Sequence, residues 1–380
     1  MALSLRKREP PRGRYTPALW PLSLVVPVAL LVAGLLGWAI YQYAYDYFAQ
    51  VATSQKPVKP VNVNDVLKAT VTALTLVGAV LAGLYAYRKQ LLSEGDAHRA
   101  DASQLAHRYT TAAEQLGHEQ AAVRLAGVYA LARLADDWEE QRQVCIDVLC
   151  AYLRMPYQPD PDQADHKAGE REVRHTVIRV IRDHLQQPDS PISWCTYAFN
   201  FTGALFDGGD FSHSHFRGMA DFGGATFSSG TVYFSWVDLS DDSIVNFGDA
   251  TFTDGSTVSF REATFTGASR AYFHRAVFDH GTVVFSDATF TGDSTVNFRE
   301  ATFNDGGTVN FTHTNFSDST VNFGDATFNG GTVNFTHARF AGGRVDFSGA
   351  TRNGGRVNFT DAIFTGTISE WGTFPVPSGA

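Results

Sequence analysis

The sequence predicts a chain in three parts: a hairpin of two membrane-spanning helices, a small α-helical module and a β-solenoid. Residues 19–41 and 69–87 are apolar and free of charge, and residues 94–187 follow a helical pattern of apolar positions. A series of large apolar residues then runs from Phe201 to Trp371. Its spacings of five and of seven or eight match neither the 3.6 period of a helix nor the alternation of an ordinary strand.

The bulk composition narrows the classes of protein to which the chain can belong. It has 380 residues, a net charge of −9 and 29 Phe. The first 18 residues are basic, whereas the chain from Trp194 onward contains 19 Asp and Glu against 9 Arg, and so acidic a half disfavours binding to nucleic acid. The three Cys form neither a disulfide framework nor a Cys-x-x-Cys pair, which fits a reducing compartment.

Both apolar stretches are long enough to cross a bilayer. Residues 19–41, at about 1.5 Å per residue, exceed a hydrocarbon core of about 30 Å, and aromatic residues lie near both ends. Residues 69–87 are bracketed by Lys68 and Arg88. The alternatives are a cleaved signal peptide for the first stretch and a buried helix of a soluble protein for the second.

The distribution of cations orients the predicted hairpin. Cations are concentrated before the first stretch and after the second, so the positive-inside rule places both ends of the chain in the cytoplasm. We therefore expect a basic cytoplasmic leader at 1–18, spans at 19–41 and 69–87, and a short extracytoplasmic loop at 42–68. The predicted location is the inner membrane of a bacterium, with two spans, and the lipid bilayer is the first expected partner.

Residues 88–190 are predicted to form a cytoplasmic helical module. Apolar residues fall close to one face of residues 119–138, and two further amphipathic segments cover 141–155 and 170–187. A loop rich in Pro and Asp separates the last two segments. The expected role is that of a rigid adaptor between membrane and solenoid, and the alternative role is a docking surface for a partner protein.

The series of large apolar residues has 29 anchor positions. Two residues before an anchor stands a smaller apolar residue, mostly Ala in the five-residue steps and Val in the longer ones. In extended backbone both side chains point the same way, so each unit is a short inward face followed by a turn, with the extra residues at corners. The predicted solenoid core includes Phe206, Phe211, Phe252, Phe265, Phe290, Phe303, Ala326, Phe328, Val333, Phe335, Ala338 and Phe340.

The units "ATF", "VNF" and "ALF" of residues 199–374 resemble the A-(D/N)-(L/F)-x-x unit of the pentapeptide-repeat family. The resemblance implies a right-handed quadrilateral β-helix over 194–374, with four units per coil, about seven coils and a length of about 35 Å. Residues 375–380 form a tail. The longer steps depart from the family's five and leave the shape of the coil open. Arg352 interrupts the anchors where a polar cap is expected to begin.

The order of the parts is also similar to that of bacterial, actinobacterial-type, membrane-anchored pentapeptide-repeat proteins, with the best likeness along residues 95–216. No biochemical activity is assigned to proteins of that type, so the resemblance does not decide the function.

Signatures of catalysis are missing from the sequence. It has no phosphate-binding loop of the G-x-x-x-x-G-K-[ST] type, no H-E-x-x-H and no G-x-S-x-G. Paired Gly recur in register with the repeat and are read as corners, while His213 and His215 lack a nearby Cys or acid cluster. We therefore predict no catalytic residue, no cofactor, no metal site and no small-molecule substrate.

Three functions are compatible with these patterns. The favoured one is a non-enzymatic, membrane-tethered scaffold that binds an unknown cytoplasmic or membrane protein. A second is an acidic imitation of DNA that binds a DNA-handling enzyme such as a topoisomerase, a role implied by the family resemblance. A third is a carbohydrate-active β-helix enzyme, for which carboxylates such as Asp249, Asp287 and Asp325 recur at equivalent corners.

Overall fold

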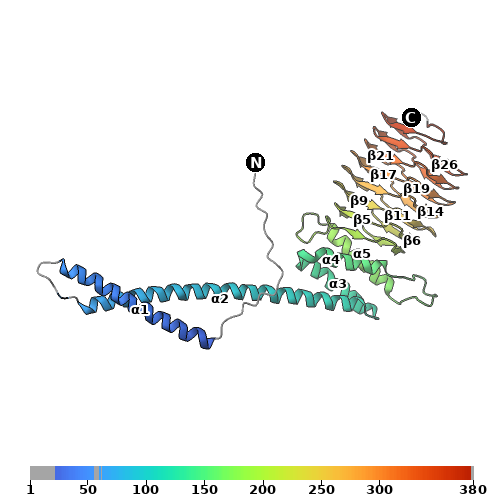
Figure 1. Cartoon of the computed structure of the whole chain (residues 1–380). Coiled ribbons are helices and arrows are strands. Elements are labelled where there is room, and N and C mark those ends of the chain that lie inside the picture. Colours follow the sequence, from blue (N-terminus) through green and yellow to red (C-terminus); the bar gives the residue numbers. More distant parts are fainter. Residues whose placement is uncertain (1–21, 55–59, 61, 378–380) are drawn as a thin grey trace. The chain divides into compact units, whose positions relative to one another are not determined.

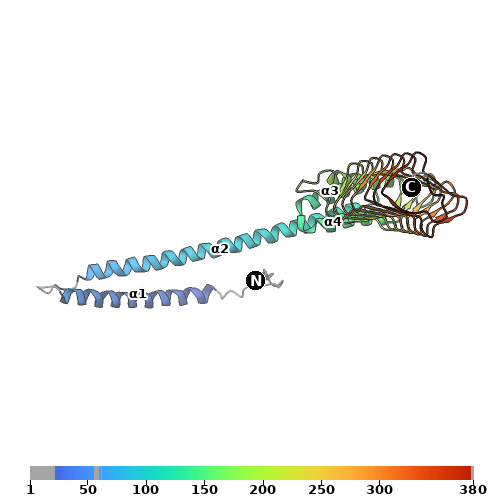
Figure 2. The ribbon, with the colours of Figure 1, turned by 90° about the horizontal axis from the view of Figure 1, so that it is seen from above.

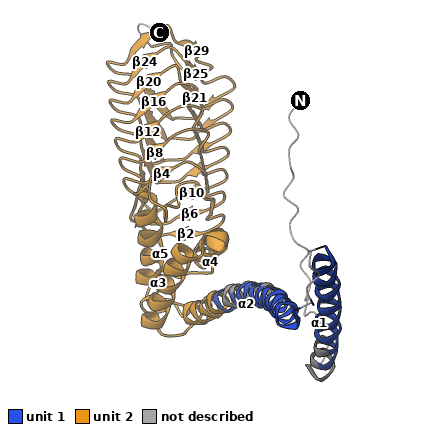
Figure 3. Cartoon of the chain, turned by 90° about the vertical axis from the view of Figure 1, so that its left-hand side faces the viewer, with its two compact units in different colours: residues 1–101 blue, residues 102–380 orange. Residues whose placement is uncertain are grey.

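The structure is a computed structural model that describes residues 22–54, 60 and 62–377. Contacts within the chain divide it into unit 1, residues 1–101, and unit 2, residues 102–380 (Figure 3). The predicted leader at 1–18 and the last three residues of the predicted tail lie outside the described residues.

Unit 1 holds two helices, α1 (Leu22–Thr53) and the first part of α2 (Val63–Leu116). Figures 1 and 2 both show α1 beside the first part of α2. The helices come close at Gly37, where an added Cβ would lie 3.5 Å from Leu74 Cδ1. Large apolar side chains such as Leu35, Trp38 and Leu76 are exposed, and a protein surrounded only by water would normally bury so many of them.

Within the described residues, one helical stretch, Val63–Gln90, is long and apolar enough to cross a membrane. It contains the second predicted span, residues 69–87. Residues 22–41 of the first predicted span are helical, but residues 19–21 lie outside the described residues, and that span stays a prediction.

Helix α2 has no break where the helical module was expected to begin, at residue 88. It continues to Leu116, and the boundary between the two units falls inside it, after Asp101. Residues 88–116 contain no Pro and are rich in Ala, Leu, Gln and Arg, which favour a helix, and the single Gly95 weakens the helix there without ending it.

Unit 2 begins with the end of α2 and a small group of helices. These are α3 (Ala121–Asp137), the 3₁₀ helix η1 (Glu139–Gln141), α4 (Arg142–Arg154) and α5 (Glu170–Leu185). Helix α3 packs against α4 and α5 through fully buried residues that include Leu131, Leu149 and Ile181. The same hydrophobic cluster continues into the first strands, so helices and solenoid share one core.

The rest of unit 2 is a right-handed β-solenoid of about seven turns (Figure 1). Its 29 short strands form four parallel sheets, here called A to D in the order in which the chain visits them. Sheet A contains β1 (Phe199–Asn200), β5 (Met219–Asp221), β9 (Ile244–Asn246), β13 (Arg270–Tyr272), β17 (Thr295–Asn297), β21 (Thr320–Asn322), β25 (Arg344–Asp346) and β29 (Ile368–Glu370). Sheet B contains β2 (Leu205–Phe206), β6 (Thr226–Phe227), β10 (Thr251–Phe252), β14 (Val277–Phe278), β18 (Thr302–Phe303), β22 (Thr327–Phe328) and β26 (Thr351–Arg352).

Sheets C and D complete each turn. Sheet C contains β3 (Gly209–Asp210), β7 (Thr231–Tyr233), β11 (Thr257–Ser259), β15 (Thr282–Val284), β19 (Thr308–Asn310), β23 (Thr332–Asn334) and β27 (Arg356–Asn358). Sheet D contains β4 (His215–Phe216), β8 (Asp238–Leu239), β12 (Thr264–Phe265), β16 (Thr289–Thr291), β20 (Asn315–Ser317), β24 (Arg339–Ala341) and β28 (Ile363–Thr365).

The corners of the coil are of two kinds, and this explains the uneven spacing of the anchors. Five-residue steps, such as Phe247 to Phe252, make the tight corners from A to B and from C to D. After the first turn, the longer steps, such as Phe252 to Phe260, make the corners from B to C and from D to A. Because the longer steps alternate with the tight ones, they fall at opposite corners and the coil stays four-sided.

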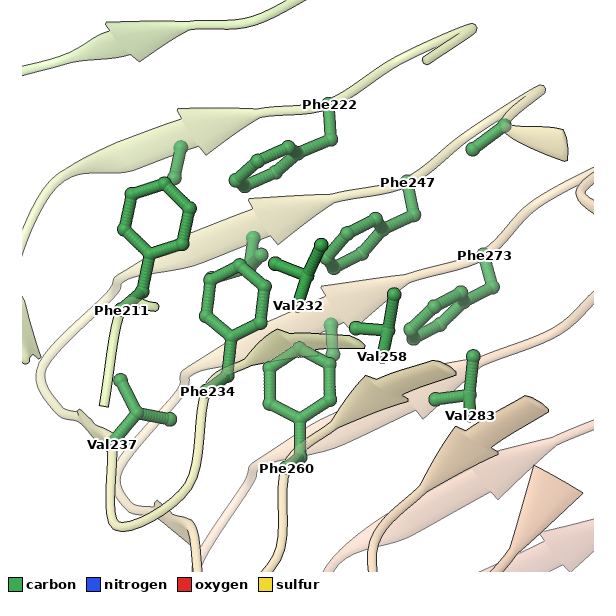
Figure 4. Packing of buried hydrophobic residues seen from close by; sticks show 14 of the residues in the cluster. Phe211, Phe222, Val232, Phe234, Val237, Phe247, Val258, Phe260, Phe273 and Val283 are labelled. Carbon is green, nitrogen blue, oxygen red and sulfur yellow. The ribbon is translucent and has the colours of Figure 1, made fainter. Parts of the chain in front are cut away.

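The interior of the solenoid is filled by columns of large apolar side chains, almost all Phe, with one column along each sheet. Figure 4 shows two of these columns, one with Phe222, Phe247 and Phe273 and the other with Phe211, Phe234 and Phe260. In sheet A the ring centroids of Phe222, Phe247 and Phe273 are 4.9 and 4.8 Å apart, with ring planes within 9° of parallel. This spacing equals the distance between paired strands, so in-register pairing stacks each ring on its equivalent in the next turn. All twelve residues predicted for the core are at most 2 % exposed.

The N-terminal end of the solenoid is covered by helices. Helix α4 packs on β1 and helix α5 packs on β3. Trp194, which precedes the first strand, is fully buried and stacks on His184 of α5 at 4.0 Å. The interior of the first turn is therefore continuous with the buried apolar residues of the helices.

The C-terminal end is covered by two aromatic side chains. Arg352, at an anchor position, is exposed, and its Nε donates a hydrogen bond to the carbonyl of Gly355 at 2.8 Å. Phe374 instead places its ring against Phe328, at 5.0 Å, and Trp371 stacks on Phe347 at 6.0 Å. The expected polar cap at Arg352 is thus an aromatic cover, because apolar rings exposed at the end of a column need apolar atoms over them.

Candidate functional site

Turn chemistry explains the Asn or Asp that often stands before an anchor Phe. Asn246 Oδ1 accepts a hydrogen bond from the backbone N–H of Gly248 at 2.9 Å, at the corner from A to B. At the corner from C to D, Asn334 Oδ1 accepts one from Thr336 N–H at 3.1 Å. Such a side chain replaces a backbone acceptor and closes the turn, so its role is structural.

The repeated "NFT" sequence forms a ladder along the same edge. Thr336 Oγ1 donates to Asn334 Oδ1 at 2.6 Å, and Asn334 Nδ2 donates to Thr312 Oγ1 of the preceding turn at 3.2 Å. Asn358 Nδ2 repeats the second contact with Thr336 Oγ1 at 3.0 Å. The Asn and Thr of this motif, which also fits the sequon for N-glycosylation, are therefore explained by the hydrogen bonds that they make between turns.

The corner from C to D carries one exposed residue other than Gly with a positive φ in every turn. We call this column the C–D ridge, and its members, with φ between 54° and 61°, are His213, Trp236, Glu262, Asp287, His313, His337 and Asp361. A left-handed backbone costs a residue with a Cβ about 1–2 kcal/mol, and Gly avoids that cost. The equivalent corner from A to B uses Gly in three turns, at Gly203, Gly224 and Gly349, and a residue with a Cβ in the other four.

Side chains of the C–D ridge are ordered by their neighbours in adjacent turns. His213 stacks on Trp236 at 4.9 Å, and Trp236 Nε1 donates to Glu262 Oε2 at 2.8 Å. Nearer the C-terminal end, His313 stacks on His337 at 4.9 Å. The ridge is thus a prearranged line of aromatic, imidazole and carboxylate groups facing solvent, and such groups are common in protein interfaces.

Carboxylates on the corner from A to B are partly neutralised. Asp249 accepts two hydrogen bonds from Arg275, at 2.8 and 2.7 Å, and these hold the pKa of Asp249 below its usual value. Arg299 donates from Nε and Nη2 to a single oxygen of Asp325, Oδ2, at 3.3 and 3.2 Å. An open hollow of about 620 Å³ beside this corner is lined by polar groups that include Asn246, Tyr272 and His274.

The junction between α5 and the first turn contains a buried carboxylate. Asp207 follows β2 and is 5 % exposed. Its Oδ2 accepts hydrogen bonds from Arg171 Nε at 2.9 Å and from the hydroxyl of Tyr157 at 2.8 Å, and His175 Nε2 lies 3.1 Å from Oδ1. Burial alone would raise the pKa of Asp207, but the hydrogen bonds from His175, Tyr157 and Arg171 outweigh it and lower the pKa to about 2.

This junction was not predicted from the sequence. Arg171 and His175 stand four apart on α5 and so share a face of the helix, which was the available signal. Their acidic partner lies more than thirty residues further along, in a stretch that reads as repeat, and no period connects the two. The Asp207 contacts fasten α5 and the loop that contains Tyr157 to the start of the solenoid.

The remaining sequence-level candidates lie where the repeat places them. The paired Gly330–Gly331, Gly342–Gly343 and Gly354–Gly355 are at the longer corners. His213 belongs to the C–D ridge, and His215 Nδ1 lies 3.2 Å from Asp238 Oδ2. Among the described residues no group of three or more His, Cys, Asp and Glu could hold a metal ion. The three Cys are buried and unpaired.

No protein-family model matches the chain, and no curated protein is significantly similar to it. The resemblance to the pentapeptide-repeat family therefore stays a prediction from the repeat itself.

Proposed function

We propose that this protein is a non-enzymatic scaffold of the pentapeptide-repeat type that is held at the inner membrane of a bacterium and binds another protein through its solenoid. In this proposal α1 and the first part of α2 form the two-span anchor, and both ends of the chain are cytoplasmic. The exposed apolar side chains of unit 1 support the anchor, since a bilayer would cover them.

The C–D ridge is the observation that carries the scaffold proposal. A residue with a Cβ adopts a left-handed backbone in all seven turns of this corner, although Gly would do so at lower cost, whereas the corner from A to B has such a residue in only four turns. An outlier of this kind, repeated in every turn at one edge, favours a role for the side chains beyond folding. Their spacing of about 4.8 Å per turn would present a partner with a rigid line of contacts.

The test is proximity labelling from a tag at the C-terminus, in cells that produce either the native chain or a ridge variant. The variant carries Trp236→Gly, Asp287→Gly and His337→Gly, which remove ridge side chains while leaving backbone that Gly adopts without strain. The control carries Thr226→Ala, Thr302→Ala and Thr327→Ala on sheet B. We expect the same membrane or cytoplasmic protein to be labelled by the native and control chains and lost from the ridge variant. Equal labelling by all three chains would remove the ridge from the proposal.

The membrane anchor has its own test. Cell fractionation and flotation should place the full chain in the membrane fraction, resistant to extraction by high salt, and a chain that starts at residue 102 in the soluble fraction. A reporter after Ala380 should be active on the cytoplasmic side. Recovery of the full chain in the soluble fraction would contradict the anchor and leave the solenoid interface untouched.

Imitation of DNA is the less favoured proposal. Acidic side chains along the corner from A to B are paired with Arg275 and Arg299, so the carboxylates do not form an unbroken negative surface there. A supercoiling assay with a topoisomerase that responded to the protein would revive this alternative.

A further inference from the structure

A cavity of about 420 Å³ lies between α5 and the first two turns of the solenoid, and none of the C–D ridge residues lines it. One wall is a stripe of basic side chains from α5: Arg171, His175, Arg179 and Arg182. These positions are four, four and three residues apart, so they share one face of the helix. The opposite wall comes from strands β3 and β7 and from the loops that precede them.

The solenoid wall of this cavity is kept open by glycine. Gly208 has a φ of +121°, and a Cβ there would lie 3.5 Å from His175 Cε1. At Gly230, with a φ of +66°, a Cβ would lie 2.7 Å from the carbonyl oxygen of Asp207. Neither position accepts a side chain without strain, so the space in front of the basic stripe stays free.

The charges that line the cavity leave a positive surplus. Three Arg face two carboxylates, Asp207 and Asp210, which gives a net charge of +1 before His175 is counted. The carboxylate of Asp207 is already hydrogen-bonded to Arg171, His175 and Tyr157, and Asp210 forms an ion pair with Arg182. The carboxylate nearest to Arg179 belongs to Glu172, whose Oε1 is 3.9 Å from Nη2.

Two of the guanidinium groups retain unused donors. Arg171 uses Nε and Nη2 on Asp207, and Arg179 uses Nη2 on the hydroxyls of Tyr129 and Thr176. Within the described part of the chain, Arg171 Nη1 and the Nε and Nη1 of Arg179 have no hydrogen-bond partner. Both side chains are well exposed, at 61 % and 44 %. Free guanidinium edges in a concave site are suited to the oxygens of phosphate.

We propose that this cavity binds a small phosphate-bearing dianion. Arg171, His175 and Arg179 can approach such a ligand along one wall. The three oxygens of a phosphate group can accept from the unused donors of both Arg171 and Arg179, whereas a carboxylate has only two oxygens. The volume falls within the range of small-molecule sites and accommodates a diphosphate or the phosphorylated end of a metabolite. Tyr233, exposed beside the cavity, offers an aromatic face to the rest of the ligand.

The experiment is isothermal titration calorimetry of the full chain in mild detergent. It measures the affinities for pyrophosphate, inorganic phosphate and acetate at constant ionic strength. Arg179→Gln removes unused donors without touching Asp207. Thr231→Phe instead fills the cavity from the β-strand wall and keeps every Arg. Arg261→Gln, which alters a similarly exposed Arg elsewhere on the solenoid, is the matched control. Circular dichroism of each variant checks that it is folded.

We expect saturable binding of pyrophosphate, weaker binding of phosphate and little binding of acetate. Arg179→Gln and Thr231→Phe should each weaken pyrophosphate binding about tenfold or more, since a charge-assisted hydrogen bond contributes at least that factor, while Arg261→Gln leaves it unchanged. Absence of saturable pyrophosphate binding at millimolar concentration would overturn the proposal. So would equal affinities in the control and in whichever cavity variant is folded, and acetate bound as tightly as phosphate would overturn the assignment of a dianion.

Discussion

At both ends of the solenoid the apolar interior must be covered from water, and the two ends use very different numbers of residues to do so. At the N-terminal end, helices α4 and α5 cover the first turn, and a buried network around Asp207 fastens them to it. At the C-terminal end, Trp371 and Phe374 are the aromatic cover, and Ile363 and Ile368 of the last strands remain exposed. Since each turn contacts only its neighbours, stability should fall along the rod from the first turn to the last.

The largest expected effect on stability comes from a substitution in the Phe column between the two ends. Phe247 stacks on Phe222 and on Phe273, so Phe247→Ala leaves a cavity that both neighbouring turns share. We expect the free energy of unfolding to fall by about 3–5 kcal/mol, measured by guanidinium denaturation followed by circular dichroism. Thr251→Ala, on the outward side of the adjacent strand, is the control. A loss below about 1 kcal/mol for Phe247→Ala would contradict the stacked core.

A second effect belongs to the N-terminal end and depends on pH. The pKa of Asp207 is lowered from 3.8 to about 2, so its stabilising contribution is present above pH 3.8 and is lost as pH falls from there toward 2. The shift corresponds to about 2 kcal/mol. Unfolding measured at pH 6 and at pH 2 should show this loss in the native chain.

The matched variants for that measurement take one carboxylate from each end. Asp207→Asn should be less stable than the native chain at pH 6 and should show a smaller further loss on acidification. Asp361→Asn, at an exposed corner of the last turn, should keep the native pH dependence. The same pH dependence in both variants would mean that Asp207 does not fasten the N-terminal end.

A smaller effect is expected at the C-terminal end. Phe374 is 5 % exposed but covers the interior from one side only, so Phe374→Ala should cost about 2 kcal/mol. Hydrogen exchange should localise the loss, with faster exchange in β26 to β29 and unchanged exchange in β1 to β4. Uniform acceleration along the rod would show that the turns unfold together and that the ends are not independent.

The smallest effect concerns a corner rather than an end. Asn334→Ala removes the acceptor for Thr336 N–H and the donor to Thr312, and we expect a cost of about 1 kcal/mol. Thr332→Ala, two residues earlier on the outward side of the same strand, should change stability by less than about 0.5 kcal/mol. Equal effects of both substitutions in thermal unfolding would remove the special role assigned to the Asn.

The solenoid could be predicted from the sequence because the residues that fill its interior recur at short distances along the chain. An anchor such as Phe328 and its partner Ala326 are two residues apart, and the spacing that repeats them is visible without any knowledge of the fold. The four-sided coil was implied by the resemblance to pentapeptide repeats, and the 29 anchors at four per coil then gave about seven turns. The long steps were also recognised, but their placement at opposite corners required the closed coil.

The junction and the C-terminal cover could not be predicted in the same way. Asp207 meets Arg171 across 36 residues, and Phe374 meets Phe328 across 46, as their numbers give, and neither pair belongs to a period. The cavity proposed to bind phosphate has the same origin, since half of its wall is helix and half is strand. Contacts between unlike elements depend on how the elements meet, and the repeat pattern contains no signal for that.

The parallel register of the strands has a consequence for how such a chain can change. Arg270 pairs with Thr295, and Thr295 pairs with Thr320, so one coil is 25 residues at this point and begins and ends on equivalent atoms. Excision or duplication of such a segment in the gene would rejoin Val to Val and Phe to Phe, and would shorten or lengthen the rod by about 4.8 Å. The length of the solenoid can therefore change between related genes by whole coils, with the fold of the remaining coils unchanged.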